Sequence, residues 1–121
     1  MNLTATELLA LLLKQEPENN LAERCCNALI EKTPASIIST GPLPIDHVRR
    51  IYGVRAETNN ENVGAVEGYA ELIRSLDEEK DETINIHSFE AEGKAFTVFT
   101  NKSCTKLLGL LISRKTLRPA T

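Results

Sequence analysis

The most restrictive feature of this sequence is a change of residue pattern after position 82. From Thr83 to Ala91 and again from Ala95 to Thr100, β-branched and aromatic residues alternate with polar ones, and Glu92-Gly93-Lys94 separates the two runs. Alternation on both sides of a short glycine-containing reversal predicts an antiparallel hairpin over 83–100. Because most of the chain before position 82 shows helical spacing instead, we expect an α+β fold.

Two helices are predicted at the N-terminus. Thr4-x-x-Glu7 is a capping box, in which the hydroxyl and the carboxylate each accept a hydrogen bond from a free backbone N–H, and it opens a helix to about Glu16. Asn20-x-x-Glu23 opens a second helix to about Lys32. Pro17 separates the two segments, so we expect a helical hairpin.

The middle of the chain alternates between turn signals and apolar runs. Residues 36–40 are short and β-branched and indicate a strand, and the turn-rich segment 41–44 follows it. Residues 46–52 predict a short helix that ends at Gly53. Thr58-x-x-Glu61 is a third capping box, and it predicts the longest, central helix, to about Asp77. On that helix we expect Val66 to face inward, and Gly64 and Gly68 to form a packing notch.

The last apolar segment fits two structures. Residues 106–114 can form a strand, but Cys104, Leu107, Leu108, Leu111 and Ile112 also follow helical spacing, and we predict a helix over 104–114. The expected architecture is an N-terminal helical hairpin and a central helix packed with a small antiparallel sheet and a C-terminal helix. At 121 residues with 41% hydrophobic residues, we expect a single compact domain over 1–116 and a flexible basic tail over 117–121.

Charge is distributed unevenly along the chain, although its net value is only −3. Residues 1–56 carry six acids and six bases, residues 57–92 carry eleven acids and two bases, and residues 93–121 carry six bases and no acid. The blocks either neutralise each other, within the fold or between subunits, or one of them meets an oppositely charged partner. The candidate partner-binding residues on the central helix are Glu67, Glu71, Arg74 and Glu78, and the candidate anion-binding residues are Lys102, Lys106, Arg114, Lys115 and Arg118.

Leucine is concentrated in the first predicted helix. Five of the six residues from Leu8 to Leu13 are leucine, more than one face of a short helix can hold. Either this helix is sandwiched inside the domain, or Leu9 and Leu12 contribute to a surface for self-association, which makes a homo-oligomer such as a homodimer an expectation. The run is too short to span a membrane, so no membrane partner is expected.

No pattern in the sequence indicates a catalytic or metal site. His47 and His87 are the two histidines, and neither lies in a known catalytic context. Cys25 and Cys26 are adjacent, so on a helix they diverge by about 100° and cannot chelate as a Cys-x-x-Cys pair does. With Cys104 they make an odd number, which suits a reducing compartment, and we expect a cytoplasmic protein. No catalytic residue, metal or cofactor is predicted.

The order of a helix, a second short helix, a turn, a longer helix and then a hairpin is also that of a winged helix-turn-helix domain, with the hairpin as the wing. The acids on the central helix oppose phosphate contact, however, so nucleic acid is a less expected partner. We expect a small non-enzymatic protein that binds another protein as an accessory, inhibitory or regulatory factor. The alternatives are a winged-helix-like nucleic-acid binder, an acidic mimic of nucleic acid, and a small ligand-sensing or enzymatic domain that uses the hairpin and His87.

Overall fold

The structure of the protein, a computed structural model, describes residues 3–14, 20–31, 37–57, 66–91 and 93–114. The described residues form four helices and four strands, which confirms the α+β class. In chain order these are α1 (Ala5–Leu13), α2 (Asn20–Glu31), β1 (Ile38–Pro44), α3 (Ile45–Glu57), α4 (Tyr69–Glu78), β2 (Thr83–Ala91), β3 (Lys94–Asn101) and β4 (Leu107–Arg114). No described helix is long and apolar enough to cross a membrane.

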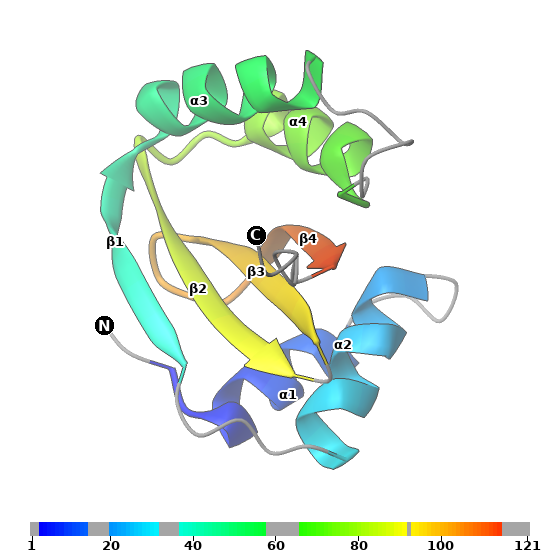
Figure 1. The fold of residues 1–121 in the computed structure, drawn as a ribbon. Helices are drawn as coiled ribbons and strands as arrows, with labels where there is room; N and C mark the ends of the chain where they lie inside the picture. The colour runs from blue at the N-terminus through cyan, green and yellow to red at the C-terminus, as the bar shows by residue number, and fades with distance from the viewer. Residues whose placement is uncertain (1–2, 15–19, 32–36, 58–65, 92, 115–121) are drawn as a thin grey trace.

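The four strands make one antiparallel sheet in the order β1-β2-β3-β4. The predicted hairpin is confirmed as β2 and β3, whose register runs from Ile84 opposite Asn101 to Ala91 opposite Lys94. These are the central strands of the sheet, so β1 and β4 are its two edges. The sheet lies between two helical layers, with α1 and α2 on one face and α3 and α4 on the other (Figure 1).

Each face of the sheet has its own apolar core. Phe89 and Phe96 stack with ring centroids 4.9 Å apart on the face covered by α1 and α2. On the opposite face Phe99 packs with Leu72 and Leu76 of α4, and all three side chains are completely buried. Period-two alternation along β2 and β3 supplies side chains to both cores, because successive strand residues point to opposite faces.

The first helix forms as predicted at its start. Thr4 accepts a hydrogen bond from the backbone N–H of Glu7, and the Glu7 carboxylate accepts one from the N–H of Thr4, which completes the capping box. Leu8, Leu11 and Leu12 are buried in the core, and Leu9 is half-buried against it. Leu12 is therefore a core residue, and its expected place on a self-association surface is wrong.

The C-terminal helix predicted over 104–114 is wrong, because this segment contains the strand β4. The segment is apolar on both of its faces: Leu110 and Ile112 enter one core, and Leu108 and Leu111 enter the other. A strand covered on both faces carries a continuous apolar run, and such a run also satisfies helical spacing over so short a length. An irregularity between Phe99 and Thr100 in the pairing with β3 shifts the alternation near Leu108.

Other predicted boundaries also move. β1 continues through the expected turn at 41–44, and α3 passes Gly53 to end at Glu57. The central helix does not include Val66 or Gly68: α4 begins at Tyr69, and Gly68 precedes it with a left-handed φ of 110°. The capping box at 58–61, Gly64, the turn at 17–19 and the tail at 117–121 lie outside the described residues, so the domain limits stay predictions.

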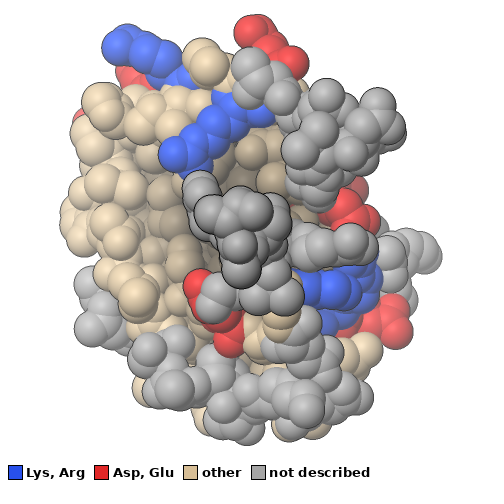
Figure 2. Space-filling view, in the orientation of Figure 1, with Lys and Arg blue, Asp and Glu red and all other residues tan. Residues whose placement is uncertain are grey.

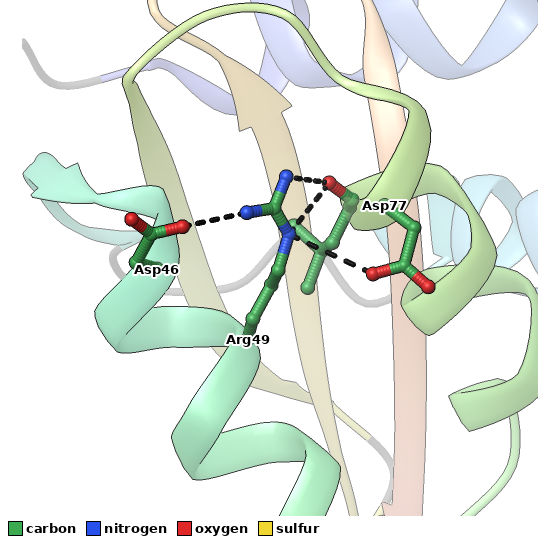
Figure 3. A network of polar contacts seen from close by, with 4 residues as sticks. Asp46, Arg49 and Asp77 are labelled. Carbon is green, nitrogen blue, oxygen red and sulfur yellow. Dashed lines mark hydrogen bonds and ion pairs between the residues drawn. The ribbon is translucent and has the colours of Figure 1, made fainter.

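The side chain of Arg49 joins α3 to the end of α4 (Figure 3). Its Nε and Nη2 donate to the carbonyl oxygen of Leu76 at 3.0 and 2.6 Å, and Nη1 donates to Asp46 at 2.6 Å. The Asp77 carboxylate lies 3.7 Å from Nε. A guanidinium here satisfies a carbonyl in the last turn of α4, where no intrahelical N–H is available, and positive charge at that end is favoured by the helix dipole.

Candidate functional site

A pocket of about 120 Å³ lies at the β4 edge of the sheet. Its walls are Leu21 of α2, then Glu71, Arg74 and Ser75 of α4, and the segment 107–110 at the start of β4. We call it the β4-edge pocket. In Figure 1 this end of the sheet lies between α4 above and α2 below. The pocket therefore combines side chains from two helices with the outer edge of a strand.

Close packing of α4 against β4 forms one wall of the pocket. Gly109 has no side chain, and a methyl group added there would lie 3.0 Å from Cα and 2.9 Å from Cβ of Leu72. Glycine at this position therefore lets α4 approach the strand backbone closely. Leu72 then points into the core, and Glu71, Arg74 and Ser75 are left along the edge.

The backbone just before α4 covers the next part of the β4 edge. Glu67 and Ile112 exchange two backbone hydrogen bonds, from Glu67 N–H at 3.0 Å and from Ile112 N–H at 3.1 Å. A Cβ at Gly68 would collide with the carbonyl oxygen of Leu110, so glycine is required for this approach. The packing notch expected at Gly68 is thus present, although it serves an extended segment instead of a helix. The pocket begins where this cover ends.

The charged groups at this edge differ in whether they are paired. Arg24 donates two hydrogen bonds to the Glu67 carboxylate at 2.8 and 2.9 Å. These bonds lower the pKa of Glu67 and raise that of Arg24. Glu71 and Arg74 are exposed at the pocket, and neither forms an ion pair with any residue that the structure describes. Within the described part of the chain, both the Glu71 carboxylate and the Arg74 guanidinium are therefore unpaired at the pocket.

The structure brings part of the predicted acidic set together. Glu71 and Arg74 line the β4-edge pocket, Glu67 lies beside it in the ion pair with Arg24, and Glu78 is exposed at the end of α4, outside the pocket lining. Two of the ion pairs, from Arg24 and from Arg49 to Asp77, join the acidic block to bases of residues 1–56. On the face shown in Figure 2, basic side chains have acidic ones beside them over the upper helices and near α2.

The predicted anion-binding residues do not form one patch among the described residues. Lys102 and Lys106 are both exposed in the turn between β3 and β4. Arg114 is the last residue of β4, opposite Lys94 and at the other end of the strand. Lys115 and Arg118 lie outside the described residues. Only Lys102 and Lys106 are therefore placed close to each other, on one turn.

Several pocket residues were absent from the sequence-based candidates. Leu21 and Ser75 lie in no sequence pattern that indicates a binding site, and a helix over 104–114 has no strand edge to recognise. The uncharged run Leu107-Leu-Gly-Leu-Leu-Ile is the one available signal, since a glycine within a continuous apolar run also fits a buried strand approached by another backbone.

The two histidines occupy different environments. His47 is exposed on α3. His87 is completely buried in β2, where its ring nitrogens contact Ser39 and Thr100, and this burial lowers its pKa. Among the residues that the structure describes, no group of three or more His, Cys, Asp and Glu side chains is placed to hold a metal ion.

Comparison with known proteins gives no match: no family model, no curated protein and no solved structure is similar to this chain. The functional assignment therefore depends on the geometry of the β4-edge pocket and its surroundings.

Proposed function

We propose that this chain is a small non-enzymatic protein that binds another protein, as an accessory, inhibitory or regulatory factor, and that the partner contacts the β4-edge pocket. The observation that carries the proposal is the position of Glu71 and Arg74. These opposite charges are exposed, have no ion-pair partner among the described residues, and lie beside the edge of an apolar strand.

The size of the pocket favours a peptide over a small molecule. Ligand sites for small molecules usually enclose roughly 300–1,000 Å³, whereas this pocket has about 120 Å³. That volume suits one side chain. An extended peptide can place one side chain in such a pocket while its main chain lies along a strand edge. We therefore propose an extended segment of the partner, with polar or charged groups opposite Glu71 and Arg74.

The winged-helix-like nucleic-acid binder has less support. In a winged domain the hairpin projects as a wing, but β2 and β3 are the central strands of this sheet. Glu71 also lies at the same pocket as Arg74, which makes that surface unfavourable for phosphate. For the compartment we propose the cytoplasm, since Cys25, Cys26 and Cys104 are all free thiols.

Self-association is a second part of the proposal, and different residues now support it. Leu13 on α1 and Ile30 on α2 are 67% and 61% exposed. Both lie in the helical layer on one face of the sheet. If they contact a second copy of the chain, Leu13→Glu should lower the molar mass measured by light scattering toward that of the monomer, whereas Lys14→Glu should leave the molar mass unchanged. A wild-type protein that is monomeric at high micromolar concentration would exclude this part.

Site-specific photo-crosslinking tests the binding proposal. A photoreactive amino acid replaces Ser75 in the pocket, and a matched variant carries it at Glu78, which is exposed on the same helix but outside the pocket lining. In native cells we expect the Ser75 variant to crosslink to one discrete protein and the Glu78 variant to give no such product. Equal crosslinking from both positions, or none from Ser75 in a correctly folded variant, contradicts the proposal.

A further inference from the structure

A main-chain donor of β4 points away from the sheet at the β4-edge pocket. Glu67 and Ile112 exchange two backbone hydrogen bonds, so the N–H and C=O groups of Ile112 point away from β3. In an antiparallel strand this outward orientation returns at every second residue, which gives Leu110 the same orientation. The close approach of Gly68 to the carbonyl oxygen of Leu110 agrees with it. The Leu110 N–H is therefore directed out of the sheet edge.

This N–H group has no acceptor among the residues that the structure describes. Leu110 lines the pocket and is only 4% exposed. The ladder that begins at Glu67 does not reach its N–H, because the chain turns into α4 at Tyr69, and no other described residue accepts from it. A buried backbone donor without an acceptor costs free energy, and such groups are rare in folded proteins. The pocket thus presents a main-chain donor beside the side chains of Glu71 and Arg74.

The order of contacts along the edge shows the direction of α4. Glu67, before the helix, pairs with Ile112, whereas Leu72, within the helix, packs on Gly109. Increasing residue number before and within α4 therefore corresponds to decreasing residue number in β4. The helix runs antiparallel to the strand, toward the start of β4.

The two unpaired charges at the pocket therefore follow the strand edge in a fixed order. Glu71 lies toward the end of the pocket at Leu110, and Arg74 lies toward the end at Leu107. Helix residues three apart have Cβ atoms roughly 5–6 Å from each other. Alternate side chains of a strand are about 7 Å apart. An extended segment can thus place one side chain opposite each charge, with a single residue between the two.

We propose that the β4-edge pocket binds an extended partner segment with the order basic, apolar, acidic, and that this segment pairs antiparallel with β4. The inference rests on the proposed function and adds the chemistry of the partner. A carbonyl oxygen of the segment accepts a hydrogen bond from the Leu110 N–H, as in strand addition at a sheet edge. The bridge between Glu67 and Ile112 is antiparallel, so the same edge already pairs in this direction.

The direction of pairing determines the order of the three side chains. A segment antiparallel to β4 runs in the same direction as α4, so its first side chain lies opposite Glu71 and its third opposite Arg74. Charge complementarity makes the first residue basic and the third acidic. The middle side chain points to the opposite face of the sheet. On that face Leu21 of α2 forms the pocket wall, which favours an apolar residue.

Two synthetic peptides of identical composition test this order on the full-length wild-type chain. Both are blocked at their ends and flanked by threonine; one carries lysine-valine-glutamate and the other carries glutamate-valine-lysine. In calorimetric titration we expect the first peptide to bind about tenfold more tightly or better, because reversal places like charges opposite each other at both positions. Equal affinities, tighter binding of the reversed peptide, or no binding of the first peptide would overturn the proposal.

Exchange of the two charges in the protein provides a matched test. A chain with both Glu71→Arg and Arg74→Glu should prefer the reversed peptide, whereas Glu78→Arg, on the same helix but outside the pocket lining, should keep the wild-type preference. Hydrogen exchange of the Leu110 amide should slow severalfold when the first peptide is bound to the wild-type chain. An unchanged preference in the exchanged chain, or an unchanged Leu110 amide, contradicts the proposed binding mode.

The crosslink from Ser75 separates this inference from the proposed function. Digestion of the crosslinked product and mass spectrometry of its peptides identify the segment of the partner that lies in the pocket. We expect a segment with the order basic, apolar, acidic. A discrete product at a segment without this order contradicts the inference alone, whereas the absence of any product contradicts the proposed function on which it rests.

Discussion

Replacement of Gly109 by alanine tests how α4 and β4 pack at the proposed binding site. The new methyl group would lie 3.0 Å from Cα and 2.9 Å from Cβ of Leu72, and 2.6 Å from its Cδ1. The Cδ1 contact can be relieved by rotation of the Leu72 side chain. The contacts with Cα and Cβ cannot, because those atoms move only with the α4 backbone. Overpacking of this kind costs about 1–3 kcal/mol of folding free energy.

The matched control is Gly53→Ala within α3, where an added methyl group would meet no atom within 4 Å. Alanine in a helix interior is favoured over glycine by about 0.5–1 kcal/mol, so this variant should be stabilised. Urea denaturation of both variants gives the free energies of unfolding, and about 4 °C in melting temperature accompanies each 1 kcal/mol for a chain of this size. We expect Gly109→Ala to lower the free energy of unfolding and Gly53→Ala to raise it, although both substitutions add the same methyl group.

The Gly109 result also discriminates between a strand and a helix over 104–114. If the segment were helical, Gly109→Ala would remove a helix-weakening glycine and raise stability, as Gly53→Ala does. A stabilised or unchanged Gly109→Ala variant would therefore refute the packing of α4 on β4 and, with it, the position of the β4-edge pocket.

Three further changes have expected outcomes. Glu67→Gln removes the ion pair with Arg24, and because the Glu67 and Arg24 side chains are 52% and 30% exposed, the loss of folding free energy should stay below about 1 kcal/mol at pH 7. Folding lowers the pKa of Glu67, so the wild type should lose this stabilisation as pH falls below about 4.5, which denaturation at several pH values measures. Arg49→Leu removes both hydrogen bonds to the Leu76 carbonyl and should cost about 1–2 kcal/mol in urea denaturation, whereas Arg50→Leu at the exposed neighbouring position should cost little. Burial lowers the pKa of His87 in the folded chain, so as pH drops the unfolded chain binds a proton at this histidine first. The free energy of unfolding should therefore fall as pH drops below about 6.5, and the fall should be smaller for His87→Gln in the same assay.

Local signals predicted the parts of this fold that depend on neighbouring residues. The Thr4 and Glu7 side chains specify the start of α1 by reciprocal hydrogen bonds, and the reversal at Gly93, with its φ of 73°, specifies the β2–β3 hairpin. Both depend on residues close in sequence, so inspection of the chain was sufficient.

Long-range packing decided the parts that were predicted wrongly. Leu107 to Ile112 satisfy two periodicities, and only pairing with β3, together with the close approach of Leu72 to Gly109, selects the strand. Gly53 would end an isolated helix, but α3 continues past it while Tyr52 packs edge-to-face on Phe99 at 4.9 Å. Such contacts are formed by residues far apart in the chain and leave no local pattern.

The candidate site was predictable only in part for the same reason. Glu71 and Arg74 were selected because they face outward on a helix, which is a local property. Their position beside Leu21 and the β4 edge depends on the tertiary arrangement.

The measurement that tests the proposed function most directly is the dissociation constant for the protein crosslinked at Ser75. Calorimetric titration would compare the wild-type chain with Arg74→Ala and Glu71→Ala at the pocket and with Glu78→Ala outside it. Loss of a charged contact at an interface typically weakens binding by about tenfold or more. We predict such losses for Arg74→Ala and Glu71→Ala, and an unchanged dissociation constant for Glu78→Ala. Equal dissociation constants for all four proteins would contradict the account.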